Sequence, residues 1–389
     1  MFGTSGTFGN RPTGLFGSTP TTTQNQMNAL EVPSPPDDTV QVLKFNPPIT
    51  GRPFLLSSGS WDSVVRVWQV NENGQCEPKA QQTVGGPVLS LEWFEDGTKL
   101  FIGSADQKVY CWDLESNQVL VCGTVLLSML FQMPTEAFWT SQVTDNGRMK
   151  KVFFFLKNKI AVFSTLSDVI SFRFWDMRQL PTQTSLATIQ LPERVYCGDM
   201  LYPMAVIGLA NRRMKVYKLD SEPREVKDTE TTLKFQSRCV AIFKDKNNVH
   251  PAGFGLGSIE GRVAIQYVEA TNPKDNFTFK CHRSPELING FQEIYAVNDI
   301  CFHPKYGTLA TAGSDGRISF WDKDSRTKLK TSDAMPHPIT CISLHGSGQI
   351  LAYAVGYDWS KGHEGNNPSQ GAKIFLYPCD QELKPKPKK

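Results

Sequence analysis

The 389-residue chain lacks the local patterns on which most enzymes and metal sites depend. Its six histidines stand singly, and there is neither a Gly-rich phosphate loop nor a Gly-x-Ser-x-Gly turn. The nine cysteines are odd in number and include no Cys-x-x-Cys pair, which is typical of a reducing compartment rather than of a disulfide framework. We therefore expect no metal, no cofactor and no catalytic residue, in a protein of the nucleus or cytosol.

A segment able to enter a membrane is also missing. The N-terminus has neither the basic start nor the continuous apolar core of a signal peptide. The most apolar stretch, 119–131, is short of the roughly 20 residues needed to cross a bilayer, so we expect no membrane insertion. The net charge of +3 is too small to indicate nucleic-acid binding by itself, so electrostatic arguments must rest on local clusters.

The two ends of the chain differ in composition from the rest. Residues 1–36 are rich in Gly, Thr, Ser, Pro and Asn, carry Phe-Gly pairs and a GLFG string at 14–17, and are expected to be disordered. Isolated Phe side chains on such a chain make weak multivalent contacts, as FG segments of nucleoporins do, although an ordinary disordered tail is the alternative. Residues 381–389 form a basic tail, either a nuclear-localisation patch or a solvated terminus.

From residue 40 the chain repeats itself at a period of roughly 40–55 residues, within the range of propeller blades. In three units an Asp precedes a Trp by six positions: Asp62 and Trp68, Asp106 and Trp112, and Asp315 and Trp321. The Asp is placed to fix the turn between two strands, and the Trp to pack between blades. Weaker copies lie at 211–217, 258–267 and 373–377.

Counting a further unit that ends at Trp175, the pattern predicts an all-β, seven-bladed WD-repeat β-propeller over residues 37–380. A closed ring leaves no long bare sheet edge, and residues 28–32 are placed to supply the outer strand of the last blade. An open solenoid is the structural alternative.

The third unit is atypical. Trp175 follows Trp112 by 63 positions, Asp168 precedes Trp175 by seven rather than six, and 119–165 carries apolar runs at 152–156 and 160–163 in place of a repeat signal. Either this blade is divergent, or the sequence carries an alternative exon or a gene-model error.

Several strings outside the repeat make a more specific match. They are LPERVYCGDMLYPMAV at 191–206, RCVAIFKDK at 238–246, GSIEGRVAIQY at 257–267, NPKDNFTFKCHR at 272–283, SFWDKDSRTKLKTS at 319–332 and YDWSKGHE at 357–364. Together with the Phe-Gly pairs and the basic tail, they closely resemble the nuclear-pore mRNA export factors of the WD-repeat superfamily, the Rae/Gle type. The resemblance covers roughly 28–112 and 175–384, which is most of the chain.

The resemblance implies a seven-bladed adaptor that is not an enzyme. Members of this family bind the GLEBS segment of an FG nucleoporin and of mitotic checkpoint proteins, contact single-stranded RNA, and take part in mRNA export and at the mitotic spindle. The implied location is the nucleus and the nuclear pore complex, with shuttling to the cytoplasm. A spindle-checkpoint scaffold or a ubiquitin-ligase propeller is the alternative. Blade three of the family carries a Gly-Ser-Trp-Asp turn that is missing here.

A basic and aromatic cluster is the candidate RNA site. Its members are Phe279, Lys280, Arg283, Trp321, Lys323, Arg326 and Lys328. Bases stack on exposed rings for roughly 1–3 kcal/mol each, while cations hold phosphates. The resemblance implies this role for all of them except Lys280 and Arg283. The alternative is that Trp321 only packs between blades and that the cations belong to a solvated loop.

Arg262, Tyr357 and Trp359 are the candidate nucleoporin-binding residues. Arg262 resembles a family Arg that meets an acidic residue of the GLEBS segment, and the fork of an Arg suits a carboxylate. The alternative for Arg262 is a turn residue equivalent to Arg317. Tyr357 and Trp359 belong to an insertion in the last blade, 357–364, whose aromatic side chains are placed to line a partner groove. Gly365 stands where the family tends to have an aromatic residue.

Overall fold

The computed structural model describes the backbone of residues 29–71, 74–124, 127–132, 138–139, 142–143, 149–150, 154–155, 159–165, 170–176, 187–220, 222–270, 272–367 and 371–386. Side chains are described over the same ranges except 123–170, 175–176 and 288. The expected disordered segment therefore lies outside the described residues as far as residue 28, and the basic tail from residue 387.

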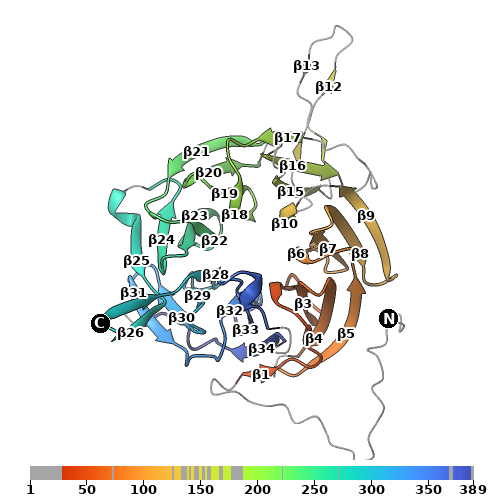
Figure 1. Cartoon of the computed structure of the whole chain (residues 1–389). Coiled ribbons are helices and arrows are strands. Elements are labelled where there is room, and N and C mark those ends of the chain that lie inside the picture. Colours follow the sequence, from red (N-terminus) through yellow and green to blue (C-terminus); the bar gives the residue numbers. More distant parts are fainter. Residues whose placement is uncertain are drawn as a thin grey trace, which may run out of the picture.

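Antiparallel four-stranded sheets surround a common centre and form a propeller (Figure 1). Six of them are described with nearly all their side chains, and each follows chain order from the centre outward except the last, which ends in β1. Their strands are β2 Val40–Phe45, β3 Phe54–Ser60, β4 Val64–Val70 and β5 Cys76–Thr83; β6 Val88–Trp93, β7 Lys99–Ser104, β8 Lys108–Asp113 and β9 Gln118–Thr124; β18 Val195–Leu201, β19 Met204–Leu209, β20 Arg213–Lys218 and β21 Arg224–Glu230; β22 Ser237–Lys244, β23 Pro251–Ser258, β24 Arg262–Tyr267 and β25 Phe277–Lys280; β28 Val297–Phe302, β29 Leu309–Gly313, β30 Ile318–Asp322 and β31 Thr327–Thr331; β32 Ile339–Leu344, β33 Ile350–Val355, β34 Lys373–Pro378 and β1 Leu30–Glu31. The expected all-β propeller is confirmed.

The atypical third unit forms strands. β10 Leu127–Gln132, β15 Lys159–Thr165, β16 Ile170–Asp176 and β17 Ala187–Gln190 pair as a further four-stranded sheet. Between β10 and β15 lie two short pairs, β11 Phe138–Trp139 with β14 Phe154–Phe155 and β12 Gln142–Val143 with β13 Met149–Lys150. The apolar run at 160–163 is thus part of β15, whereas 119–124 belongs to β9, the outer strand of the second blade. Asp168 lies outside the described residues.

The ring is closed by the start of the chain. β1 pairs antiparallel with β34, Leu30 opposite Leu376, as the sequence predicted for 28–32. Ala29 and Val32 are buried, so the expectation of disorder up to residue 36 is wrong for this stretch. Their apolar side chains join the clusters between blades, which offsets the entropy lost on ordering.

The repeated Trp residues fill the interfaces between blades. Trp68 packs against the β32–β34 blade and Trp112 against the β2–β5 blade, both with no exposed surface. Their indole N–H groups donate to the Pro33 carbonyl at 2.8 Å and to Asn117 Oδ1 at 3.0 Å. Trp175 lies in β16, but its side chain is outside the described part of the chain.

The repeated Asp residues clamp the turns that precede these Trp strands. Asp62 Oδ1 accepts from the Val64 amide at 2.9 Å, and Asp106 Oδ1 accepts from the Lys108 amide at 3.2 Å. Asp315 Oδ1 accepts in the same way from the Arg317 amide at 3.1 Å. A carboxylate that accepts from the amide two residues later forms an Asx turn, which explains why an Asp recurs at this turn of the repeat.

Acidic side chains of the innermost strands tie neighbouring blades together. Asp199 Oδ2 on β18 accepts from the Ile242 amide on β22 at 2.6 Å, and Asp299 Oδ2 on β28 accepts from the Ile342 amide on β32 at 2.9 Å. Burial raises the pKa of Asp299 to about 6, although hydrogen bonds from the amides of Ile342 and Ile300 act to lower it.

Candidate binding surfaces

The first surface lies where the β22–β25 blade meets the β28–β31 blade. We call Phe277, Phe279, Trp321, Arg326 and Lys328 the inter-blade aromatic surface. The ring centroids of Phe279 and Trp321 are 4.6 Å apart, and those of Phe277 and Phe279 are 6.2 Å apart. Phe277 and Phe279 lie on β25, the outer strand of its blade, Trp321 lies on β30, and all three rings are partly exposed.

Cations lie over these rings. Lys328 Nζ is 5.5 Å from the centroid of the Trp321 ring, and Arg326 Cζ is 4.5 Å from that of Phe277. Both cations are exposed, and Arg326 also donates to the carbonyl of Lys274, in the turn η2 Pro273–Asp275. Each pair is a cation–π contact, which holds a positive charge beside an aromatic face.

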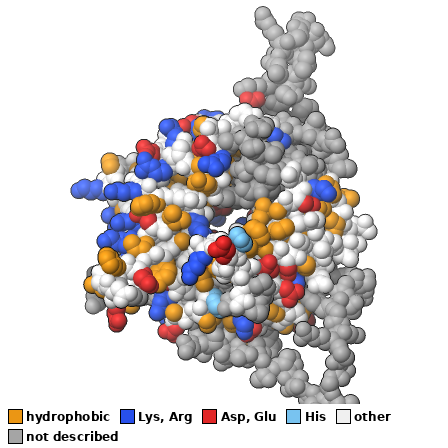
Figure 2. All heavy atoms as spheres, in the orientation of Figure 1, with side chains coloured by type: hydrophobic (Ala, Val, Ile, Leu, Met, Phe, Trp, Pro, Cys, Tyr) orange, Lys and Arg blue, Asp and Glu red, His pale blue; other side chains and the backbone are white. Residues whose placement is uncertain are grey.

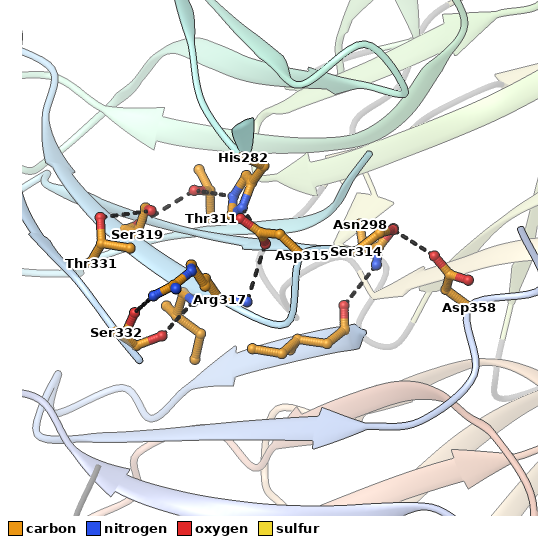
Figure 3. A network of polar contacts seen from close by, with 12 residues as sticks. His282, Asn298, Thr311, Ser314, Asp315, Arg317, Ser319, Thr331, Ser332 and Asp358 are labelled. Carbon is orange, nitrogen blue, oxygen red and sulfur yellow. Dashed lines mark hydrogen bonds and ion pairs between the residues drawn. The ribbon is translucent and has the colours of Figure 1, made fainter. Parts of the chain in front are cut away.

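Trp321 is held in place by a buried polar network. Its indole N–H donates to Thr311 Oγ1 at 3.2 Å, and this hydroxyl is 2.8 Å from His282 Nε2. His282 Nδ1 in turn lies 2.8 Å from Asp315 Oδ1 (Figure 3). Trp321 can therefore both pack between blades and belong to a binding surface, since one edge of the ring is fixed while the side chain stays partly exposed.

Lys323 is separated from the other cations of the predicted RNA site. Only 6% of this residue is exposed, its Nζ lies 2.9 Å from Asp324 Oδ1, and the ammonium sits 4.8 Å from the centroid of the Phe243 ring. In this conformation Lys323 cannot meet a phosphate directly, because its charge is enclosed by a carboxylate and an aromatic face.

Lys280 and Arg283 lie close to Arg262. Arg262 on β24 is directly opposite Lys280 on β25, and its Nε lies 3.3 Å from Glu260 Oε2. Arg283 donates to the carbonyl of Glu260 at 3.0 Å. Two of the predicted RNA residues, Lys280 and Arg283, thus also lie near the predicted nucleoporin residue Arg262.

The second surface is an aromatic cluster formed by Trp61, Tyr357 and Trp359, which we call the aromatic platform. The Trp61 and Trp359 ring centroids are 4.9 Å apart, and those of Tyr357 and Trp359 are 5.7 Å apart. Trp359 has φ +59°, so the backbone of the 357–364 insertion makes a left-handed turn there. The insertion ends in the short helix η3 His363–Gly365.

Asp358 holds this insertion to its neighbours. Asp358 Oδ2 accepts from Ser314 Oγ at 2.5 Å (Figure 3). Asp358 Oδ1 accepts from the Ser360 amide at 3.1 Å. Burial opposes ionisation of Asp358, but these hydrogen bonds hold its pKa below the ordinary value. Sequence reasoning missed Asp358 and Trp61, although both stand in aromatic-acidic strings, YDW and WD, at turns of the repeat.

Charge is unevenly distributed around the ring. Figure 2 shows Lys and Arg side chains gathered over the part of the ring where Figure 1 places β21, β24 and β25.

No group of three His, Cys, Asp or Glu in the described chain is arranged to hold a metal ion. Within the same residues, no helix has the length and apolar character that crossing a bilayer requires.

Comparison with known proteins identifies the family. The family model "WD domain, G-beta repeat" matches residues 78–113 and 276–322. The chain is 52% identical to "mRNA export factor rae-1" of Caenorhabditis elegans and 48% identical to "mRNA export factor" of Danio rerio, in both cases over 100% of both chains. It is 49% identical to "Protein Rae1" of Drosophila melanogaster, over 96% of this chain and 99% of that protein. With this similarity along its whole length, the chain belongs to the mRNA export factor (Rae1) family of WD-repeat proteins.

Proposed function

We propose that this protein is a non-enzymatic adaptor in mRNA export, which joins single-stranded RNA to the GLEBS segment of an FG nucleoporin at the nuclear pore. The observation that carries the proposal is the inter-blade aromatic surface, where partly exposed rings stand beside exposed cations. Two of the relatives are named mRNA export factors, which supports the same role. The ring closes with seven blades, and the β10–β15–β16–β17 sheet serves as the third.

RNA binding at the inter-blade aromatic surface follows from its chemistry. A splayed base can stack on the exposed part of Phe279 or Trp321, while Lys328 and Arg326 attract the adjoining phosphates. The two rings are already in contact, so less conformational entropy is lost when RNA binding orders them. Asp324 is exposed nearby and reduces the local positive charge, so the affinity is modest. Because cations hold the phosphates, the affinity also falls with added salt.

Nucleoporin binding is assigned to Arg262 and the aromatic platform. The Arg262 side chain is 35% exposed and already pairs with Glu260, so an acidic residue of the partner must share or displace that carboxylate. Tyr357 and Trp359 offer apolar faces at fixed positions because Asp358 holds their loop. An extended segment that is apolar with one acidic residue matches both features.

The proposed location is the nucleus and the nuclear pore complex, with shuttling to the cytoplasm. Mitotic checkpoint proteins, the mitotic spindle and a ubiquitin ligase are further partners that the same adaptor can serve. Affinity purification followed by mass spectrometry distinguishes these partners from a nucleoporin.

The decisive test measures the two activities in the same set of variants. Calorimetry with a GLEBS peptide and fluorescence anisotropy with single-stranded RNA are compared for the unmodified chain, for Arg326→Glu/Lys328→Glu and for Arg262→Glu. The first variant should lose RNA binding and keep the peptide, whereas the second should lose the peptide and keep RNA. Lys79→Glu, on the outer strand β5, is a matched control that should change neither. Loss of both activities in each variant would contradict two separate surfaces.

A further inference from the structure

A hairpin that neither proposed surface uses stands between two blades. Its strands, β26 Arg283–Ile288 and β27 Phe291–Ile294, pair only with each other among the described strands. The turn is formed by Asn289 and Gly290, with φ +51° and +82°, as a type I′ hairpin requires. The Asn-Gly pair between two short apolar stretches signals this hairpin in the sequence.

The hairpin carries the most exposed large apolar side chains described in the chain. Phe291 is 78% exposed, Leu287 is 68% exposed and Ile294 is 49% exposed. Ile294 lies against Gly261, so the apolar patch continues toward the β23–β24 turn. Several exposed apolar side chains on one hairpin lower the solubility of a protein, and they are typical of a contact site.

The charges on the hairpin limit what can bind there. Glu286 and Glu293 are both exposed. Glu293 is two positions after Phe291 on β27 and therefore lies on the same face of the hairpin, where its carboxylate also accepts from the Tyr295 hydroxyl. Leu287 is opposite Gln292 and shares the other face with Ile294. Arg283, the only cation of the two strands, is directed to the carbonyl of Glu260. The carboxylates repel nucleic acid and acidic segments and favour an apolar segment that is neutral or basic.

The chain itself contains such a segment. Residues 1–28 include no acidic residue and one basic residue, Arg11. Their large apolar side chains include Phe2 and Phe8 on one side of Arg11 and Leu15 and Phe16 on the other. These apolar side chains and the single cation complement the face of the hairpin that carries Phe291, Glu286 and Glu293.

The described chain also begins in a blade next to the hairpin. The described chain begins at Ala29, directly before β1, in the blade that packs against the β28–β31 blade. The hairpin leads into β28 of that neighbouring blade. Phe16 is thirteen positions before Ala29, a stretch that spans up to about 45 Å when extended.

We propose that the β26–β27 hairpin binds the protein's own Phe-Gly segment on the face that carries Phe291, with Phe8, Leu15 or Phe16 against Phe291 and with Arg11 beside Glu286 and Glu293. The contact buries few side chains and is therefore reversible. A Phe-bearing segment of another protein competes for the same hairpin.

Photo-crosslinking in the full-length protein tests the proposal. p-Benzoylphenylalanine in place of Phe291 should crosslink to residues 1–28, and the same group in place of Val249, which is 59% exposed on another turn, should not. Phe8→Ser/Leu15→Ser/Phe16→Ser should reduce the crosslink at least fivefold. Arg11→Glu should weaken it, and combining it with Glu286→Lys/Glu293→Lys should restore it.

The same experiment separates other occupants. Mixing unlabelled and 15N-labelled chains shows whether a crosslink joins two copies, and crosslinks mainly between copies would overturn binding within one chain. The proposal also fails if residue 291 does not reach residues 1–28, or if the triple Ser variant leaves the yield unchanged. None of these variants alters a residue of the inter-blade aromatic surface or the aromatic platform, so the result is independent of RNA and nucleoporin binding.

Discussion

Arg238 and Asp358 are 120 residues apart in the sequence, yet the guanidinium of Arg238 donates to the main-chain carbonyl of Asp358 at 3.3 Å. Arg238 lies on the β22–β25 blade and Asp358 on the β32–β34 blade, with the β28–β31 blade between them. The Asp358 carboxylate accepts from Ser314 of that middle blade. One residue therefore ties three consecutive blades together and fixes the loop that carries Tyr357 and Trp359.

Asp358→Asn should loosen this loop. The amide keeps one acceptor oxygen where the carboxylate uses two, so the bond to Ser314 or to the Ser360 amide is lost, at a cost of about 1–3 kcal/mol in the free energy of unfolding. We expect affinity for a GLEBS peptide to fall roughly tenfold, which is about 1.4 kcal/mol, with RNA affinity unchanged. Calorimetry measures the peptide affinity, and near-ultraviolet circular dichroism of the Trp61–Trp359 pair measures the loosening of the loop.

Glu364→Gln is the matched control, because it removes a carboxylate from the same insertion at an exposed position. It should leave peptide affinity and the dichroism unchanged. Equal losses in both variants would show that the charge of the loop, and not its fixed position, determines binding.

Phe279→Ala should weaken RNA binding without unfolding the protein. Phe279 is partly exposed and hydrogen-bonds to nothing through its side chain, whereas Trp321 also holds Thr311. Loss of one stacking ring should cost roughly 1–3 kcal/mol in binding, or about 5- to 150-fold in Kd. Fluorescence anisotropy with a labelled single strand measures it. Phe235→Ala, at a 55% exposed site on another loop, should have no effect, and an equal loss there would point to nonspecific binding.

The repeat and the closing strand could be predicted, the first from local signals and the second from the need to cover a sheet edge. An Asp two residues before an amide, and a large aromatic residue six positions on, are visible in the sequence as turn and packing signals. The pairing of residues 30–31 with β34 followed from the need to cover the edge of the last blade.

The location of individual charges could not be predicted in the same way. Lys323 and Lys328 are five positions apart and both basic, yet one is enclosed by Phe243 and Asp324 while the other is exposed over Trp321. The difference depends on the neighbouring blade, which contributes Phe243 from 80 residues earlier in the chain. Asp358 was missed for a similar reason, since its partners Arg238 and Ser314 come from two other blades.

Trp112→Ala should destabilise the ring more than any surface substitution. The indole is fully buried between the β6–β9 and β2–β5 blades, so truncation leaves a cavity and removes the hydrogen bond to Asn117. The expected loss is roughly 3–5 kcal/mol in the free energy of unfolding, measured by urea denaturation. Trp61→Ala, which is partly exposed, is the control and should cost much less; similar losses would contradict an inter-blade packing role.

Stability should fall on mild acidification because of His345. This side chain is fully buried, with its ring 3.7 Å from that of Phe54, and burial lowers its pKa to about 4. Since an unfolded His titrates near 6.5, the unfolded state binds the proton first between pH 6.5 and 4. Folding is therefore disfavoured progressively as the pH falls through this window, by up to roughly 3 kcal/mol from this group.

Asp299 acts in the opposite direction, because its pKa is raised to about 6 and the folded state binds its proton first. The test must therefore compare variants at each pH rather than read one curve. His345→Gln should lower stability at pH 7 and remove most of the loss between pH 6.5 and 4, whereas the exposed His363→Gln should leave the curve unchanged. Urea denaturation at half-unit steps of pH measures both, and a His345→Gln curve parallel to that of the unmodified protein would show that another group controls the acid response.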